Sequence, residues 1–385
     1  MRLLIHDFDE IEWNKVSDKY KGWEIISDDG SIKPCIGCFG CWIKTPGKCL
    51  IKDSYDKMGA LIHKADELLV ISRYTYGGFS PFIKNVFVRS IGWVLPFFEV
   101  INNEMHHKSR YPEEKPISFI FRGSNLTEED KAMAQKYVKA VCLNFHGIIK
   151  DISFQELDDE LKSGSYDGTN LEASSEKALL INCSLRADNA NTKKILTALS
   201  DKLSPEKEII NLSSYMSNME SILPKIKASD RIILGIPLYV DGIPSHVLRL
   251  MKMIEISGSI KNKKIYIVTN MGFYESSQEE NLLAMARKWT EDCDAIYGGG
   301  LGIGAGEMVC KMIDGPAAEK GPSKNAALAL NTLAQAINGA ESIEDIYVNP
   351  YMFPRSLYML AANSGWTRGI KANGLKKKDL YNQIN

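Results

Sequence analysis

The chain has 385 residues, of which 44% are hydrophobic and 25% charged, a globular composition that excludes extensive disorder. At about 150 residues per domain, this length predicts two or three domains. Its 47 Lys and Arg residues balance 48 Asp and Glu residues, for a net charge of −1, so the basic excess typical of nucleic-acid-binding proteins is absent. This balance favours chemistry on a buried small molecule.

Neither a membrane span nor a signal peptide is expected. No segment reaches the roughly 18 unbroken apolar residues of a spanning helix, and the N-terminal residues 1–7 turn acidic at once. These features predict a cytoplasmic protein with no membrane partner. In that compartment the eight cysteines are expected to be thiols or metal ligands rather than disulfides.

Short apolar runs alternate with longer helical patterns along the chain. The expected strands are 3–5, 67–72, 117–121, 178–182, 231–236 and 264–269, and the expected helices include 128–143, 192–203 and 280–292. This alternation predicts parallel sheets with helices packed on their faces.

The first expected strand ends in an acidic segment, residues 6–12, which contains Asp7, Asp9, Glu10 and Glu12. Four carboxylates would repel a phosphate group rather than bind it. The first half of the chain is therefore expected to be the poorer place for a phosphate-bearing cofactor.

Four cysteines form the sharpest motif of the sequence. Cys35, Cys38, Cys41 and Cys49 have the spacing C-x2-C-x2-C-x7-C. Thiolates at this spacing can converge on one metal centre, and the run of three favours a [4Fe–4S] cluster. Structural zinc sites usually combine two separated pairs, so zinc is a weaker alternative, and four buried or redox-active thiols are another. The motif resembles that of iron–sulfur flavoproteins, although relatives with such cysteines and no cluster exist.

Two segments after the cysteines extend this resemblance. Residues 51–56, which include Asp53, and the loop at residues 76–86 are similar to stretches of flavodoxin-family proteins. Such relatives commonly have Asp-Arg soon after the loop, whereas this chain has Val88-Arg89. An acidic contact is therefore expected to be missing here.

The chain repeats itself at an offset of 164 residues. Residues 65–70 match residues 229–234, and the same offset pairs Gly78 with Gly242. Two copies of one α/β unit explain these matches. A polar, Gly- and Ser-rich linker at 156–168 separates the copies. The expected domains are 1–171 and 172–342, followed by a C-terminal extension, 343–385.

The strand at 178–182 runs into a loop that opens a helix. Such a loop directs backbone N–H groups and the positive end of the helix dipole at one spot, which suits an anion. Ser184 and Thr192 supply hydroxyls, Asn191 lies at the helix start, and Arg186 supplies a planar fork that fits phosphate oxygens. The alternative is an ordinary turn capped by Asn191 or Thr192.

The loops after the next two strands carry aromatic and small residues able to flank a flat ring. In open α/β sheets, ligands bind at the carboxyl ends of the strands. The candidate ring contacts are Pro237, Leu238, Tyr239 and Gly242 in one loop, and Asn270, Met271, Gly272 and Phe273 in the other.

Together these segments, over most of residues 177–310, resemble the NADPH-dependent FMN reductase family. The resemblance implies that the loop of Ser184, Arg186, Asn191 and Thr192 holds the FMN phosphate, and that the two later loops contact the isoalloxazine ring. The expected fold is α/β: two flavodoxin-like, doubly wound parallel-sheet domains in tandem with a C-terminal helical tail.

The function implied by this resemblance is that of an FMN-dependent NAD(P)H oxidoreductase with a small-molecule or protein electron acceptor. The alternative is an iron–sulfur flavoprotein that carries electrons between protein partners without NAD(P)H turnover. No catalytic acid or base is assigned. The resemblance leaves open the substrate, the choice between NADH and NADPH, and whether the chain forms a homodimer.

A glycine-rich segment at residues 300–305 matches the dinucleotide fingerprint G-x-G-x-x-A. That fingerprint requires a βαβ unit. Because residues 325–336 indicate a helix with no strand after it, we expect a glycine-rich loop rather than a dinucleotide site.

Overall fold

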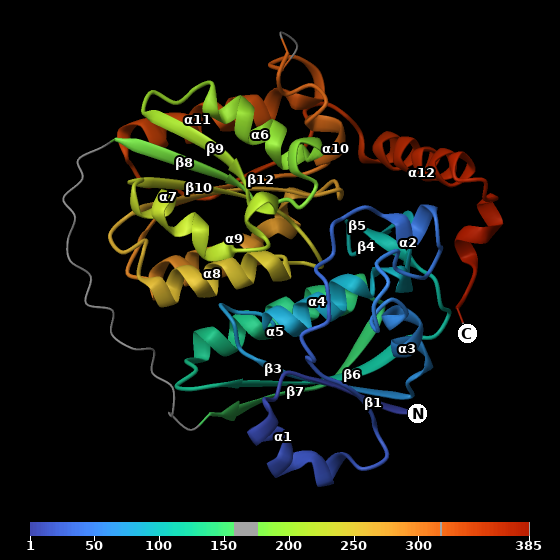
Figure 1. Ribbon diagram of the computed structural model, residues 1–385. Coiled ribbons are helices and arrows are strands. Elements are labelled where there is room, and N and C mark those ends of the chain that lie inside the picture. The colour runs from blue at the N-terminus through green and yellow to red at the C-terminus, as the bar shows by residue number, and fades with distance from the viewer. Residues whose placement is uncertain (158–175, 316–317, 385) are drawn as a thin grey trace. The chain divides into compact units, whose positions relative to one another are not determined.

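The computed structural model describes residues 1–157, 176–315 and 318–384 and divides the chain into two compact units (Figure 1). The first unit comprises Met1–Glu160 and Met359–Asn385, and the second comprises Leu161–Tyr358. The expected boundary between residues 171 and 172, and most of the expected linker, lie outside the described residues. The expected extension 343–385 is not a separate body, since its residues are divided between the two units.

The first unit is built on a sheet of five parallel strands in the order β2-β1-β3-β6-β7. These strands are β1 (Arg2–His6), β2 (Glu24–Ile26), β3 (Glu67–Arg73), β6 (Lys115–Gly123) and β7 (Gly147–Glu156). Its helices are α1 (Glu10–Val16), α2 (Gly40–Ile43), α3 (Met58–Lys64), α4 (Pro81–Arg89) and α5 (Glu128–Asn144). An antiparallel hairpin, β4 (Val94–Ile101) with β5 (Glu104–Ser109), is inserted after α4.

The second unit has six parallel strands in the order β13-β12-β11-β10-β8-β9. They are β8 (Lys177–Asn182), β9 (Glu206–Asn211), β10 (Arg231–Pro237), β11 (Lys264–Asn270), β12 (Ile296–Ile303) and β13 (Ile346–Val348). The helices are α6 (Asn191–Ser200), α7 (Leu223–Lys227), α8 (Ser245–Ser257), α9 (Glu280–Asp292), α10 (Gly306–Val309) and α11 (Lys324–Gly339). Apolar residues of α6 and α11 form one core with the sheet.

Both strand orders confirm the expected fold class. Numbered within its own sheet, each unit reads 2-1-3-4-5, with β13 added beyond the fifth strand in the second unit. This is the flavodoxin-like order, in which ligands bind where the strand order reverses. The expected helices at 128–143 and 280–292 are confirmed as α5 and α9. The helical tail is α12 (Arg355–Ala372). None of the described helices is long and apolar enough to cross a bilayer.

The internal repeat is visible in a tight turn that both units share. Thr75 pairs with Gly78 in the first unit, and Tyr239 pairs with Gly242 in the second, at the offset of 164 seen in the sequence. Both central residues of each turn have positive φ angles, which defines a type I′ turn. One turn geometry therefore follows the third strand of both sheets.

The expectation for the glycine-rich segment is wrong in two respects. Gly300 and Gly302 lie inside β12 rather than in a loop, and a parallel strand, β13, does follow helix α11. Only three residues long, β13 carries a weak sequence signal. Glycine is needed in β12 because a Cβ at Gly298 would meet the Tyr266 ring at 2.4 Å, and one at Gly302 would meet the Glu279 carboxyl at 2.8 Å.

Candidate functional site

The start of helix α6 is open. Its N-cap residue, Ala190, provides no side-chain hydrogen bond. The backbone N–H groups of Asn191, Thr192 and Lys193 have no acceptor among the residues that the structure describes. Uncapped N–H groups at the positive end of a ten-residue helix form a favourable position for an anion.

Arg186 projects from the loop that leads into this helix. Its side chain is exposed and has no ion-pair partner among the described residues. Behind it, Asn182 holds the loop from the end of β8, since its side-chain amide donates to the Ala187 carbonyl (3.0 Å) and to Asn211 (2.9 Å). Ser184 is buried, and its hydroxyl accepts from the Arg186 N–H (3.4 Å). A rigid loop thus presents an unpaired guanidinium.

The loops after β10 and β11 are tied directly to this region. The Thr192 hydroxyl donates to the Asn270 side chain (2.7 Å), and the Leu238 N–H donates to the Asn270 carbonyl (3.1 Å). The structure therefore brings together the expected phosphate loop and both expected ring loops at the carboxyl ends of β8, β10 and β11. Because its hydroxyl proton is already donated, Thr192 can offer an anion its backbone N–H.

Exposure differs among the predicted ring contacts. Leu238, Tyr239 and Phe273 are partly exposed and Gly272 is exposed, so these four can meet a ligand. The other four predicted ring contacts are buried inside the loops. Those buried residues are Pro237, Gly242, Asn270 and Met271.

One residue of the β10 loop is strained. Val240 has a φ of 45°, a left-handed conformation that a β-branched residue rarely adopts, and Asp241 follows with a φ of 59°. Such strain costs about 1–3 kcal/mol and persists where the surrounding structure imposes it, often at ligand sites. Strain at this turn therefore supports a binding role for the loop.

These residues fit FMN. The open α6 terminus and Arg186 suit a phosphate dianion, and the exposed face of Gly272, where no atom lies within 4 Å of the position a Cβ would take, leaves room beside a flat ring. The residues that would hold the phosphate are Ser184, Arg186, Asn191 and Thr192.

The equivalent edge of the first unit is closed by its own side chains. At the start of α1, the Asp9 carboxylate accepts from the Glu12 N–H (2.8 Å), while the Glu12 carboxylate accepts from the Asp9 N–H (2.9 Å). This capping box uses the helix terminus that α6 leaves open.

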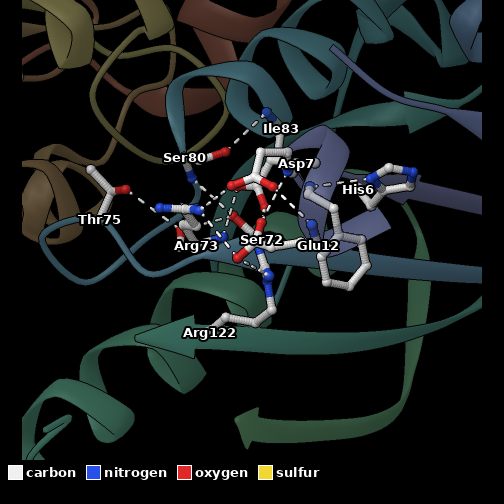
Figure 2. Close-up of polar contacts among 11 residues, drawn as sticks. His6, Asp7, Glu12, Ser72, Arg73, Thr75, Ser80, Ile83 and Arg122 are labelled. Atoms are coloured by element: carbon white, nitrogen blue, oxygen red, sulfur yellow. Dashed lines mark hydrogen bonds and ion pairs between the residues drawn. The ribbon is translucent and has the colours of Figure 1, made fainter. Parts of the chain in front are cut away.

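Two arginines at this edge are also occupied (Figure 2). Arg122 of β6 pairs with Glu12 (2.9 Å) and with Asp7 (3.3 Å), and Arg73 of β3 pairs with Glu12 (3.2 Å). Burial raises the pKa of Asp7, opposed by hydrogen bonds from Ser80 and the two arginines. The expected acidic segment does lie at the strand ends, but three of its carboxylates, those of Asp7, Asp9 and Glu12, are paired with arginines. The described edge does not fit an FMN phosphate.

The four cysteines of the motif lie close together in the first unit. Burial, followed by the neighbouring charges of Cys35, Cys49 and Cys38, raises the pKa of Cys41 well above its ordinary value. Burial, followed by the charges of neighbouring cysteines, raises the pKa of Cys35 to about 12. The N–H groups of Gly37 and Gly40 donate to the sulfurs of Cys35 and Cys38, both at 3.4 Å.

Arg89 anchors both ends of the segment that carries the four cysteines, residues 33–53, which we call the cysteine segment. Its side chain is fully buried and all five of its N–H groups donate: to Cys49 Sγ (3.2 Å), to the carbonyls of Lys33 (2.8 Å) and Ile51 (3.2 Å), and twice to Asp53 (2.8 Å each). Asp53 is thus the acidic partner of Arg89, while position 88, where such relatives commonly have Asp, is occupied by the buried Val88.

The metal assignment stays a prediction. No group of three or more His, Cys, Asp or Glu side chains in residues 1–157, 176–315 and 318–384 is arranged to hold a metal ion. The structure thus shows grouped thiols with hydrogen-bond donors around them.

A buried carboxyl group lies beneath the β11 loop of the second unit. Glu279 is 0% exposed and accepts from the Thr269 hydroxyl (3.1 Å) and from the Ile303 N–H, while its Oε2 atom has no partner among the described residues. Burial raises the pKa of Glu279 well above its ordinary value of 4.5. Burial thus favours the neutral form of this side chain.

Replacing Glu279 by glutamine is expected to change how stability depends on pH. Because the folded-state pKa is raised, the contribution of Glu279 to the free energy of unfolding is complete below about pH 4.5. That contribution is lost as pH rises through the folded pKa. The unfolding free energy of the natural protein should thus fall relative to E279Q by about 1.4 kcal/mol per pH unit in that window. Urea denaturation from pH 4 to 9 measures this difference, and parallel curves would contradict it.

Comparison with known proteins gives structural matches at low sequence identity, of which three are described. No protein-family model matches the chain, and no curated protein does. A flavodoxin, a WrbA-like protein from Agrobacterium tumefaciens, is 14% identical over 43% of this chain and 98% of its own, with a TM-score of 0.31. An FMN-dependent NADH-azoreductase from Bacillus anthracis in complex with FMN is 16% identical over 42% of this chain and 99% of its own, with a TM-score of 0.29.

A flavone reductase is 15% identical over 44% of this chain and 66% of its own, with a TM-score of 0.32. At these identities and TM-scores the matches carry no argument about function. The fold assignment rests on the strand orders, and the function on the site itself.

Proposed function

We propose that the second unit binds FMN and that the chain is an NAD(P)H-dependent FMN oxidoreductase. The observation that carries this proposal is the open α6 terminus beside the unpaired Arg186, tied through Asn270 to the two loops that follow β10 and β11. Phosphate chemistry and ring-flanking residues then meet at the point in the strand order where flavodoxin-like sheets bind ligands.

The residues divide into two tasks. Arg186 and the α6 N–H groups neutralise and orient the phosphate, while Tyr239 and Phe273 flank the ring and limit water on either side of it. When bound, FMN would supply two-electron chemistry, accepting a hydride from NAD(P)H. The chain positions the ring. The hydride transfer itself requires no acid or base from the protein.

Anaerobic stopped-flow mixing tests the proposed activity. Protein loaded with FMN is mixed with NADPH or NADH, and loss of the flavin absorbance is followed. The proposal predicts rapid bleaching with at least one of the two nucleotides. Bound flavin that neither nucleotide reduces, but that a reduced ferredoxin-type protein does, would instead favour the alternative, an electron carrier between proteins.

For the first unit, we propose that Cys35, Cys38, Cys41 and Cys49 hold a [4Fe–4S] cluster. The residue types support this, since four thiols in one segment, three of them with N–H donors directed at sulfur, are soft ligands. Because the described side chains are not arranged to hold a metal ion, cluster binding would draw the four sulfurs together. Counting iron and acid-labile sulfide in anaerobically purified protein tests it. About four of each per chain is expected, and values near zero would favour redox-active thiols.

A further inference from the structure

Residues 349–358 of the second unit form a segment that we call the strap. It follows β13 and ends in the first turn of α12. Sequence patterns place these residues in a separate C-terminal extension, but they belong to the same unit as the β10 and β11 loops.

Four hydrogen bonds join the strap to the chain that follows β11. Asn349 accepts from the Ser276 N–H (2.8 Å), and the Tyr274 hydroxyl donates to the Phe353 carbonyl (2.6 Å). The other two bonds come from the start of α12. These are Arg355 to the Glu275 carboxylate (2.6 Å) and Tyr358 to the Gly272 carbonyl (2.7 Å). The strap thus bonds to Gly272, Tyr274, Glu275 and Ser276, on both sides of Phe273.

The Tyr358 contact reaches the predicted ring loop itself. Tyr358 is 7% exposed, and burial raises its pKa, so the hydroxyl keeps its proton and acts as a donor. Its acceptor is the carbonyl of Gly272. Since the space where a Gly272 Cβ would stand is open, the peptide is held through its carbonyl while its Cα faces free space.

The Arg355 contact holds Glu275, two residues after Phe273. Its ion pair with Glu275 is partly buried, with side chains 28% and 13% exposed. Partial burial makes this pair less sensitive to salt than a surface pair. Two bonds therefore hold residues on both sides of Phe273, one of the predicted ring contacts: Gly272 through its backbone carbonyl and Glu275 through its side chain.

We infer that the strap is a positioning element for the ring of the bound flavin, with Tyr358 acting through the Gly272 carbonyl. The inference rests on the proposed function. Tyr358 itself does not touch the cofactor. Within the described residues, the strap bonds to residues 272–276 of the β11 loop and, on its other side, to Pro322 and Asn325, and no bond joins it to the loop at 184–192. It should therefore govern recognition of the ring and leave the phosphate grip unchanged.

Replacing Tyr358 by phenylalanine tests this inference, because the change removes one hydroxyl and keeps the ring. The Kd values of FMN and of riboflavin, which lacks the phosphate, are measured by quenching of flavin fluorescence. Both should rise by the same factor, about 3- to 10-fold, as expected for the loss of one positioning hydrogen bond. Arg355→Met should act in the same direction.

Tyr266→Phe is the matched control. Tyr266 is also buried, at 0% exposed against 7% for Tyr358, and its hydroxyl donates to the carbonyl of Glu341 (2.7 Å), with that of Ala336 3.2 Å away, outside the ring loops. It should leave both Kd values unchanged. Unchanged Kd values in Y358F, or a loss confined to FMN, would overturn the strap's role.

A second readout separates the strap from the proposed function. Hydrogen exchange of residues 270–276 in flavin-free protein should be about 3- to 10-fold faster in Y358F than in the natural protein or Y266F. If the natural protein binds no flavin, the proposed function fails and so does the strap's role in positioning a ring. Unaltered exchange would show that the strap does not hold the loop, whatever the ligand.

Discussion

Replacing Arg89 by methionine is expected to lower the free energy of unfolding of the first unit by about 3–5 kcal/mol. The substitution keeps an unbranched apolar stem but leaves Asp53, whose side chain is 6% exposed, as an unpaired charge in the interior. It also removes the N–H donors that Arg89 provides to Cys49 Sγ and to the carbonyls of Lys33 and Ile51. Because these acceptors flank the cysteine segment on both sides, its anchoring should be lost as well.

Urea denaturation followed by tryptophan fluorescence measures this loss, since five of the six tryptophans lie in the first unit. Asp53→Asn should also destabilise, because it leaves the Arg89 charge buried without a counter-charge. Lys150→Met breaks the exposed pair with Glu67 and should cost less than about 1 kcal/mol. If R89M and K150M lose similar amounts of stability, the buried ion pair of Arg89 with Asp53 does not anchor the cysteine segment.

Replacing Arg186 by alanine is expected to weaken FMN binding by about 10- to 100-fold while leaving riboflavin binding unchanged. A hydrogen bond to a charged group contributes about 1.5–3 kcal/mol, and Arg186 is the unpaired guanidinium of the phosphate loop. Because the side chain is exposed and makes no ion pair within the described residues, its removal should change stability by no more than about 0.5 kcal/mol.

Isothermal titration with FMN and with riboflavin distinguishes the two ligands. Arg249→Ala, which removes the same kind of exposed side chain from α8 of the same unit, is the matched control and should leave both affinities unchanged. Equal losses for FMN and riboflavin in R186A would place Arg186 at the ring rather than the phosphate. If R186A binds both FMN and riboflavin as tightly as the natural protein does, Arg186 does not contact the bound flavin.

The topology is predictable from the sequence because its strands are short apolar runs separated by amphipathic helices. The 164-residue offset also marks a real structural repeat, since the type I′ turns at Thr75–Gly78 and Tyr239–Gly242 occupy equivalent places. The strand, loop and helix that we propose as the phosphate site were predictable for a similar reason, as they follow one another within 25 residues of chain.

Contacts between distant residues were not predictable. Asp53 and Arg89 are 36 residues apart, and nothing in the motif Val88-Arg89 says that its acidic partner comes from the cysteine segment. Tyr358 lies 86 residues from Gly272 and looks like part of an unrelated tail until β13 brings the chain back to the sheet. The signal for that return was the run Ile346-Tyr347-Val348, which is β-branched and aromatic but only three residues long.

The most direct test of the central proposal is the stoichiometry of FMN binding to the full-length chain, measured by equilibrium dialysis of flavin-free protein. One FMN per chain is expected, bound far more tightly than riboflavin, because the α6 terminus is open and the α1 terminus is closed by Asp9 and Glu12. Two FMN per chain would show that the first unit also binds the phosphate. No binding at FMN concentrations up to the millimolar range would contradict the proposal.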